Sequence, residues 1–87
     1  MTVKQIVDLL KLKLGIVSGV MDPRLEHLVE AIIEELTEEK GIGIALDNPR
    51  HTSFITDYAE YRYKNVTEEM PRYLMHRLHN LYLKDKA

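Results

Sequence analysis

Apolar residues recur three or four positions apart in four stretches of the chain, which is the spacing of one face of an α-helix. In the first half, the predicted core-facing residues are Val3, Ile6, Val7, Leu10, Leu14, Leu25, Leu28, Val29, Ile32, Ile33 and Leu36. In the second half they are Phe54, Ile55, Tyr58, Tyr61, Met70, Leu74, Leu78 and Leu81. No segment alternates with period two over a useful length. The pattern therefore predicts a small all-α domain of four helices.

Helix starts are marked by residues that cap free backbone N–H groups. Thr2 followed by Gln5 is a capping-box pair, and Asp22-Pro23 and Asn48-Pro49 each place an acceptor before a proline at the first helical position. Thr67-Glu68-Glu69 puts two acids where the dipole of a fourth helix favours them.

Two glycines supply helix ends, since Gly15 and Gly41 can adopt the left-handed conformation of a C-terminal cap. Pro71 falls within or near the first turn of the fourth helix, which leaves its start open. The loop of residues 41–46 is the only strand candidate. The predicted helices span about 3–14, 23–40, 49–63 and 68–84.

The length of 87 residues predicts one domain, residues 1–87, with one modest core. The composition, 45% hydrophobic and 30% charged, is that of a soluble protein. No apolar run approaches the roughly 20 residues that cross a bilayer, and a signal peptide pattern is absent, so no membrane association is expected. The lack of cysteine excludes disulfides, thiolate zinc sites and cysteine nucleophiles, and fits a reducing cytosol.

Charge is unevenly distributed along the chain. Residues 1–43 carry five basic and eight acidic side chains, and residues 44–87 carry seven and six. The halves therefore have net charges of −3 and +1, which gives no basic footprint typical of nucleic-acid binding. Opposite fields of this kind could help like subunits associate head to tail.

Four glutamates, Glu26, Glu30, Glu34 and Glu38, lie four positions apart and form one acidic ridge on the second helix. The ridge is either a solvated helix face, a metal cluster or a wall that repels phosphate. Like charges at this spacing are slightly destabilising, which invites a reason outside the monomer. A metal is disfavoured because no histidine shares the ridge.

His76 and His79 have a spacing that could hold a transition metal, but no third ligand is evident, and surface or interface histidines are favoured. His27 and His51 stand alone, and we assign them no chemistry.

Gly41-x-Gly43 resembles half of a phosphate-binding loop. Because it follows a helix, a helix cap followed by an apolar loop is the favoured interpretation. Ile42 and Ile44 in that loop must be covered, either by this chain or by another.

No nucleophile motif, cofactor loop or metal set is present, and the paired carboxylates lie on one convex face rather than in a cleft. The chain is therefore predicted not to be an enzyme and to need no cofactor. Tyr63, Tyr73 and Tyr82 lie off the core positions, as rim residues of the monomer or as interface anchors.

Two segments of the chain resemble a known protein family. They run from Glu38 to Tyr63 and from Met70 to Leu83. In order, the matching pieces are Glu39-Lys40-Gly41, Asp47-Asn48-Pro49, Asp57-Tyr58-Ala59, Arg62-Tyr63, Met70-Pro71-Arg72 and Arg77-Leu78-His79-Asn80-Leu81. In these pieces the chain resembles the head–tail connector (adaptor) proteins of bacteriophages with long non-contractile tails. The resemblance covers about residues 25–83, while residues 1–24 match less distinctly. Any longer C-terminal extension is expected to be missing or reduced to Leu83–Ala87.

The resemblance implies a helical, non-catalytic structural virion protein that assembles as a ring of about twelve copies. The ring would join the portal protein of the capsid to a tail-side connector or stopper protein at the neck of the virion, after assembly in the cytoplasm of the bacterial host. Double-stranded DNA would pass through it without sequence-specific binding. A basic lumen would hold the phosphates, so the glutamate ridge is a candidate for the channel wall.

Residues predicted to contact a neighbouring subunit or the portal are Arg72, His76, Arg77, His79, Asn80 and Tyr82 on the fourth helix, with Ile42 and Ile44 in the loop. Arg77 lies near the margin of the core face, where its stem can pack and its guanidinium can find a partner. The alternative function is a small nucleic-acid-binding phage regulator, because the fourth helix is rich in cations. Against it, the gap before the third helix is longer than a helix-turn-helix turn.

Overall fold

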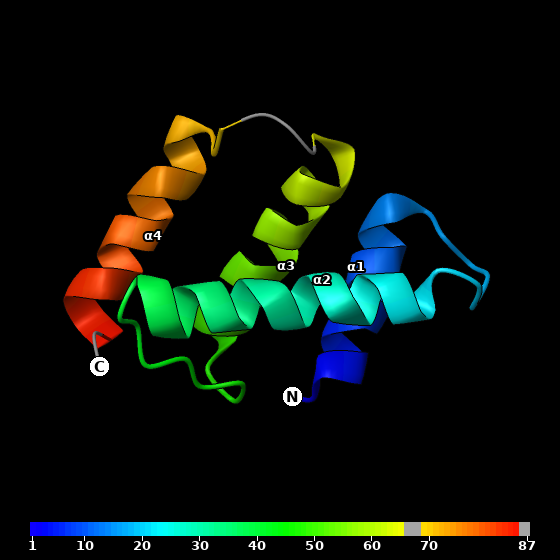
Figure 1. The fold of residues 1–87 in the computed structure, drawn as a ribbon, viewed down its shortest axis with the longest axis horizontal. Coiled ribbons are helices and arrows are strands. Elements are labelled where there is room, and N and C mark those ends of the chain that lie inside the picture. The colour runs from blue at the N-terminus through cyan, green and yellow to red at the C-terminus, as the bar shows by residue number, and fades with distance from the viewer. Residues whose placement is uncertain (66–68, 86–87) are drawn as a thin grey trace.

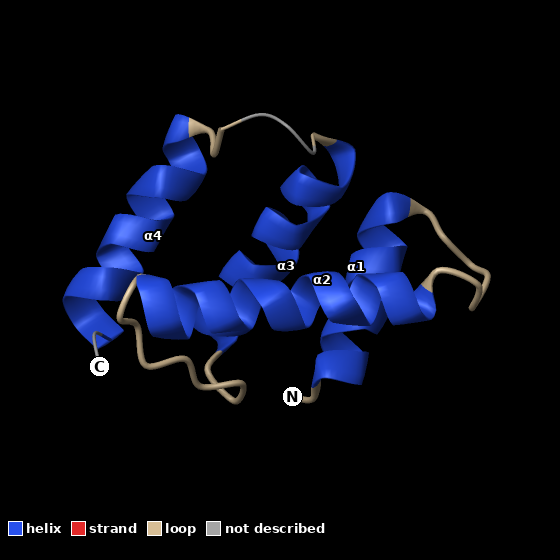
Figure 2. Cartoon of the chain, viewed as in Figure 1, coloured by secondary structure: helices blue, strands red, loops and turns tan. Residues whose placement is uncertain are grey.

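The structure, a computed structural model, describes residues 1–65 and 69–85, and its regular elements within these ranges are all helices. They are α1 (Val3–Leu14), α2 (Asp22–Glu34), the π-helical turn η1 (Glu35–Glu39), α3 (Pro49–Lys64) and α4 (Arg72–Asp85). The all-helical fold with four helices is therefore confirmed. The loop of residues 41–46, considered as a strand, forms none (Figure 2).

The helices form a thin slab of 37 × 27 × 19 Å. Figure 1 shows α2 and η1 crossing in front of α1 and α3, with α4 at one end and the α1–α2 loop at the other. Helix α3 is central, since it packs against α1, α2 and α4, whereas α4 packs against α3 alone among the described helices. One broad face of the slab is thus formed by α2 and η1, and the opposite face by α1, α3 and α4.

Most predicted helix ends are confirmed by their hydrogen bonds. Thr2 Oγ1 accepts the N–H of Gln5 at 3.2 Å, and Gln5 Oε1 accepts the N–H of Thr2 at 2.8 Å, which completes the capping box. Gly15 adopts a left-handed φ of 73° and ends α1. Asn48 caps α3 by accepting the N–H of Arg50 at 2.9 Å.

Helix α2 differs from the prediction at both ends. Met21 occupies the capping position, and Asp22 is already helical with no side-chain cap, because its carboxylate pairs with Lys11 of α1 at 2.9 Å. At the other end the last turn widens into η1, where the N–H of Lys40 donates to the carbonyl of Glu35 five residues earlier. Gly41, at φ 66°, then stops the helix as expected.

Helix α4 begins later than expected, at Arg72 rather than near residue 68. The residue before a proline is disfavoured in the helical conformation, so Pro71 keeps Met70 and Glu69 outside the helix. The carbonyl of Pro71 instead accepts the first N–H groups of the helix, from Leu74 and Met75. Thr67 and Glu68, expected in its first turn, lie outside the described residues.

One core joins all four helices and is built largely from the predicted faces. Its fully buried members are Ile6, Val7, Leu10, Leu25, Val29, Ile32, Leu36, Ile42, Phe54, Ile55, Ala59 and Leu74. Leu28, Ile33, Tyr61, Met70 and Leu78, also predicted to face inward, are partly buried at its margin. None of the described helices is long and apolar enough to cross a membrane.

Candidate functional site

The outer face of α4 carries most of the polar residues predicted to contact a partner. Arg72, His76, His79 and Asn80 are all exposed there, since α4 packs against α3 and turns this face to solvent. In the part of the chain that the structure describes, no three potential ligands are close enough to hold a metal, so His76 and His79 lack the third ligand of such a site. Their role in a protein contact stays a prediction.

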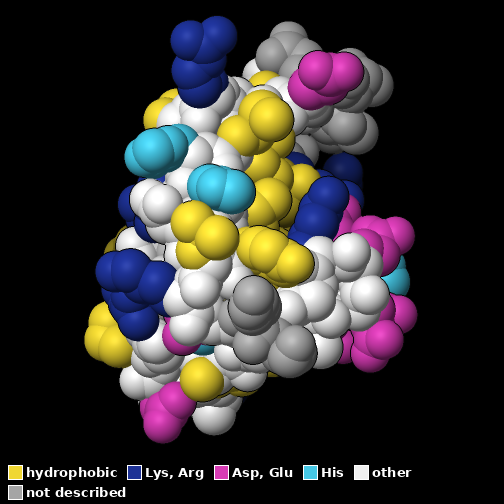
Figure 3. Space-filling model, turned by 90° about the vertical axis from the view of Figure 1, so that its left-hand side faces the viewer, with side chains coloured by type: hydrophobic (Ala, Val, Ile, Leu, Met, Phe, Trp, Pro, Cys, Tyr) yellow, Lys and Arg dark blue, Asp and Glu magenta, His cyan; other side chains and the backbone are white. Residues whose placement is uncertain are grey.

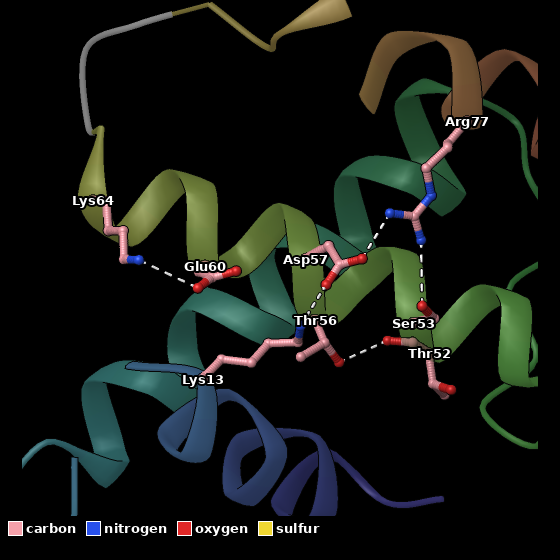
Figure 4. A network of polar contacts seen from close by, with 8 residues as sticks. All are labelled: Lys13, Thr52, Ser53, Thr56, Asp57, Glu60, Lys64 and Arg77. Atoms are coloured by element: carbon pink, nitrogen blue, oxygen red, sulfur yellow. Dashed lines mark hydrogen bonds and ion pairs between the residues drawn. The ribbon is translucent and has the colours of Figure 1, made fainter. Parts of the chain in front are cut away.

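Arg77 differs from these residues because its guanidinium turns toward α3. Its Nη1 lies 2.6 Å from Oδ2 of Asp57, and its Nη2 donates to Oγ of Ser53 at 3.3 Å. Lys13 of α1 approaches the other oxygen of Asp57 at 3.0 Å. Figure 4 shows this network, in which one carboxylate on α3 ties together α1 and α4. Arg77 thus finds its partner within the chain.

The electrostatics of this network favour the ionised pair. Burial alone would raise the pKa of Asp57, but the hydrogen bonds from Arg77 and Lys13, together with their charges, outweigh it and lower that pKa. The same hydrogen bond and the charge of Asp57 raise the pKa of Lys13. Both shifts stabilise the charged forms that hold the three helices together.

His51, to which the sequence analysis gave no role, links the start of α3 to the end of α4. Its ring is only 1% exposed, and its Nδ1 accepts the N–H of Ala45 at 2.9 Å. The proton of the neutral ring must therefore sit on Nε2, from which it is donated to Oδ2 of Asp85 at 2.9 Å. This hydrogen bond lowers the pKa of Asp85, with help from the charges of Arg50 and Lys84.

The loop between η1 and α3 joins this link through its backbone. The N–H of Gly43 donates to the carbonyl oxygen of Asp85 at 2.6 Å. A Cβ at this glycine would lie 3.4 Å from the same oxygen, which is an ordinary van der Waals contact, so the hydrogen bond does not itself require glycine. The two partners are 42 positions apart, and the sequence carried no local signal for this contact.

The loop residues Ile42 and Ile44 require a correction. Ile42 is fully buried in the core of its own chain, so its side chain is not available to a neighbouring subunit. Ile44 is partly buried against the same core. The cover of this apolar loop is therefore the chain itself, because the loop folds back under α3 and α4.

An exposed apolar surface runs along α4 beside its core-facing side, and we call it the α4 stripe. Met75, Leu78 and Tyr82 line it together with Lys40 at the end of η1, around a shallow hollow of about 400 Å³. Met75 and Tyr82 are 57% and 43% exposed. Figure 3 shows hydrophobic side chains gathered in a band on this end of the molecule.

Exposed apolar side chains also occur toward the other end of the slab, and we call this group the α1 end. Val17 and Val20 in the α1–α2 loop are 98% and 82% exposed, and Leu12, near the end of α1 and beside a hollow between α1 and α3, is 79% exposed. Figure 1 places this loop and α4 at opposite ends of the long axis. Two separate apolar surfaces on so small a chain are a feature of sites that bind other proteins.

The glutamate ridge lies on the face formed by α2 and η1. Glu30, Glu34 and Glu38 are exposed and Glu26 is partly buried. None of the four forms an ion pair with a cation of the described residues. The neighbouring Glu35 does form one, with Arg62 at 3.7 Å.

No protein-family model, curated protein or solved structure matches this chain. The resemblance to phage connector proteins therefore stays a prediction that rests on the residues themselves. The matching pieces fall from η1 to α4, around the α3–α4 contact and its two polar links.

Proposed function

We propose that this chain is a structural virion protein, an adaptor that joins two different protein partners in the neck of a long-tailed bacteriophage. The observation that carries the proposal is the pair of apolar surfaces, the α4 stripe and the α1 end, at opposite ends of the slab. An adaptor must present two distinct surfaces to two neighbours, and the α4 stripe and the α1 end differ in their residues. The resemblance of residues 25–83 to head–tail connectors supplies the identity of the neighbours.

In this function one end of the slab contacts the portal protein and the other contacts a tail-side connector or stopper protein. His79 lines the α4 stripe, and with the exposed Arg72 and His76 of the same helix it would give an apolar contact a polar rim. Asn80 instead lines the groove between α3 and α4. Tyr82, within the stripe, has the amphipathic side chain that is enriched at interface centres.

Copies of the chain would form a ring of about twelve subunits around the DNA, which passes without sequence-specific contact. Strong binding of phosphates to the lumen would slow that passage. The glutamates of the ridge, Glu26, Glu30, Glu34 and Glu38, are therefore candidates for the channel wall. The ring would assemble in the cytoplasm of the bacterial host and remain in the virion.

The experiment is to locate the chain in purified virions by electron microscopy, with a tag at its N-terminus and untagged particles as the control. We expect density for the tag at the neck, between head and tail. Particles that lack the chain, or that carry it elsewhere, would contradict the proposal.

A nucleic-acid-binding regulator is the second candidate, and one observation favours it. Arg50, Arg77 and Lys84 line a groove between α3 and α4, where a phosphate backbone could bind. A salt-dependent mobility shift on duplex DNA, lost in Lys84→Glu, would support the regulator, whereas no shift would favour the adaptor.

A further inference from the structure

The groove between α3 and α4 encloses a hollow of about 460 Å³. Phe54 and Leu81 supply apolar surface, and Arg50, Arg77, Asn80 and Lys84 supply polar groups. The exposed residues of α3 beside it, such as Ser53, are on the side away from the buried face that packs against α2. The groove therefore opens on the face of the slab opposite α2 and η1.

The groove carries an excess of positive charge. Arg77 and Lys13 share a single carboxylate, Asp57, so that this network retains one positive charge. Arg50 is 3.8 Å from Asp85, a carboxylate already bonded to His51. Lys84 is exposed and forms no ion pair with any described residue.

The opposite face has the complementary charge. Glu34, Glu35, Glu38 and Glu39 line a hollow of about 450 Å³ at the junction of α2 and η1, with Arg62 as its only lining cation. Arg62 lies within ion-pair distance of Glu35, and the other three carboxylates have no cationic partner in the described residues. In Figure 3, acidic side chains gather at the right-hand edge and several Lys and Arg side chains lie at the left-hand edge.

We propose that the α3–α4 groove of one copy binds the acidic hollow of a second copy. The two surfaces lie on opposite faces of a slab whose thinnest dimension is 19 Å, so the contact is heterologous and each copy keeps one free surface of each kind. Repetition gives a ring when the rotation closes. The inference rests on the proposed function as a ring, and it names the surfaces by which the subunits join.

The charges select a second copy over other occupants. The hollow has carboxylates without a cationic partner, and the groove has cations in excess of its carboxylates, so a head-to-tail contact between copies of the same chain pairs opposite charges without any other component. The contact uses Glu34 and Glu38 between subunits, which leaves Glu26 and Glu30 as candidates for the channel wall.

A charge exchange between two variants tests the contact. Variant A carries Glu34→Lys and Glu38→Lys, and variant B carries Asn80→Asp and Lys84→Glu. Each alone brings like charges together, and we expect self-association to weaken at least about tenfold in sedimentation velocity at low salt. In an equimolar mixture, every contact between a copy of A and a copy of B brings opposite charges together. The mixture should therefore associate as well as the wild type. Variant C, with Lys4→Glu and Arg24→Gln at exposed positions outside both surfaces, is the control matched in charge to variant B.

Cross-linking provides a readout that does not require a stable free ring. The chain has no cysteine, so Glu38→Cys with Lys84→Cys places one thiol on each surface. A short bis-maleimide should give a ladder of dimers, trimers and larger species with this pair, and dimers at most with either single variant. A ladder no stronger than that of Lys4→Cys with Lys84→Cys would overturn the inference.

The results separate this inference from the proposed function. A chain found at the virion neck without the ladder would keep the adaptor and reject these surfaces. A ladder from a chain that is absent from virions would keep the contact and reject the adaptor. Retardation of duplex DNA that is lost in variant B, without a ladder, would assign the groove to phosphate and overturn the inference.

Discussion

The imidazole of His51 donates a hydrogen bond from Nε2 to Oδ2 of Asp85 at 2.9 Å, across 34 positions of sequence. The ring is buried, and its other nitrogen accepts the N–H of Ala45. The bond joins the last residue of α4 to the start of α3. It therefore holds in place the helix that carries most of the predicted contact residues.

His51→Ala should destabilise the fold by about 1–3 kcal/mol, because it leaves the part-buried N–H of Ala45 without its acceptor and removes the bond to Asp85. Urea unfolding followed by circular dichroism measures the loss. His27→Ala is the matched control, since His27 is exposed on α2, and it should change stability by less than about 0.5 kcal/mol. Equal effects of the two substitutions would show that the link is energetically unimportant.

The stability of the fold should depend on pH through Asp57 and Asp85. Both have folded-state pKa values below their ordinary value, so the unfolded chain binds protons more readily than the folded one. Their contribution is fully present above about pH 4–5 and is lost as pH falls through the lowered folded-state values. Unfolding free energies measured from pH 7 to pH 2 should decline below about pH 5, and less steeply in Asp57→Asn with Asp85→Asn. Identical pH profiles would exclude these two carboxylates as the source.

Arg77 and Asp57 should be energetically coupled. Arg77→Ala removes the ion pair, the bond to Ser53 and the stacking of the guanidinium 5.6 Å above the ring of Phe54, and should cost about 1–2 kcal/mol. A double-mutant cycle with Asp57→Ala isolates the pair, with a coupling energy of about 0.5–1 kcal/mol. Arg72→Ala on the same helix is the control, because Arg72 is exposed and has no ion-pair partner in the described residues. Strict additivity of Arg77→Ala and Asp57→Ala would contradict the pairing.

Met75→Ser with Tyr82→Ser should leave the monomer folded while weakening attachment at one end at least about tenfold, since both side chains are exposed in the α4 stripe. Pull-down with portal rings and with tail-side connectors measures each attachment separately. Tyr73→Ser is the control, because Tyr73 is 61% exposed on the same helix but outside the stripe.

Val17→Ser with Val20→Ser changes the α1 end instead, and should impair attachment to the other of the two partners. The assignment of the two ends to two partners would be contradicted if the α4-stripe variant and the α1-end variant impaired the same attachment. It would also be contradicted if neither variant impaired any attachment.

Glu26→Lys with Glu30→Lys should slow DNA ejection from assembled particles without preventing ring formation, because cations in the channel wall would bind the passing phosphates. Fluorescence of a DNA-binding dye after receptor-triggered opening measures the ejection rate. Glu60→Lys, on the opposite face of the slab, is the control. Unchanged ejection kinetics in the Glu26 and Glu30 variant would remove these residues from the channel.

Local sequence determined the helices and most of their ends. The capping box of Thr2 and Gln5, the cap at Asn48 and the stop at Gly15 depend on hydrogen bonds and backbone preferences within a few residues, and all three were predicted. Apolar spacing likewise identified the core faces, because a helix presents every third or fourth residue on one side. The start of α4 was missed although its signal was local, since the constraint that Pro71 imposes on Met70 outweighed the acidic residues before it.

The tertiary structure alone decided which polar and apolar residues are available to partners. His51 meets Asp85 and Arg77 meets Asp57 only because α3 and α4 pack together, and Ile42 is buried only because its loop folds back into the core. The same packing places acidic and basic surfaces on opposite faces of a thin slab. Such contacts join residues far apart along the chain, so their geometry depends on how the helices pack, and no periodicity or capping signal encodes it.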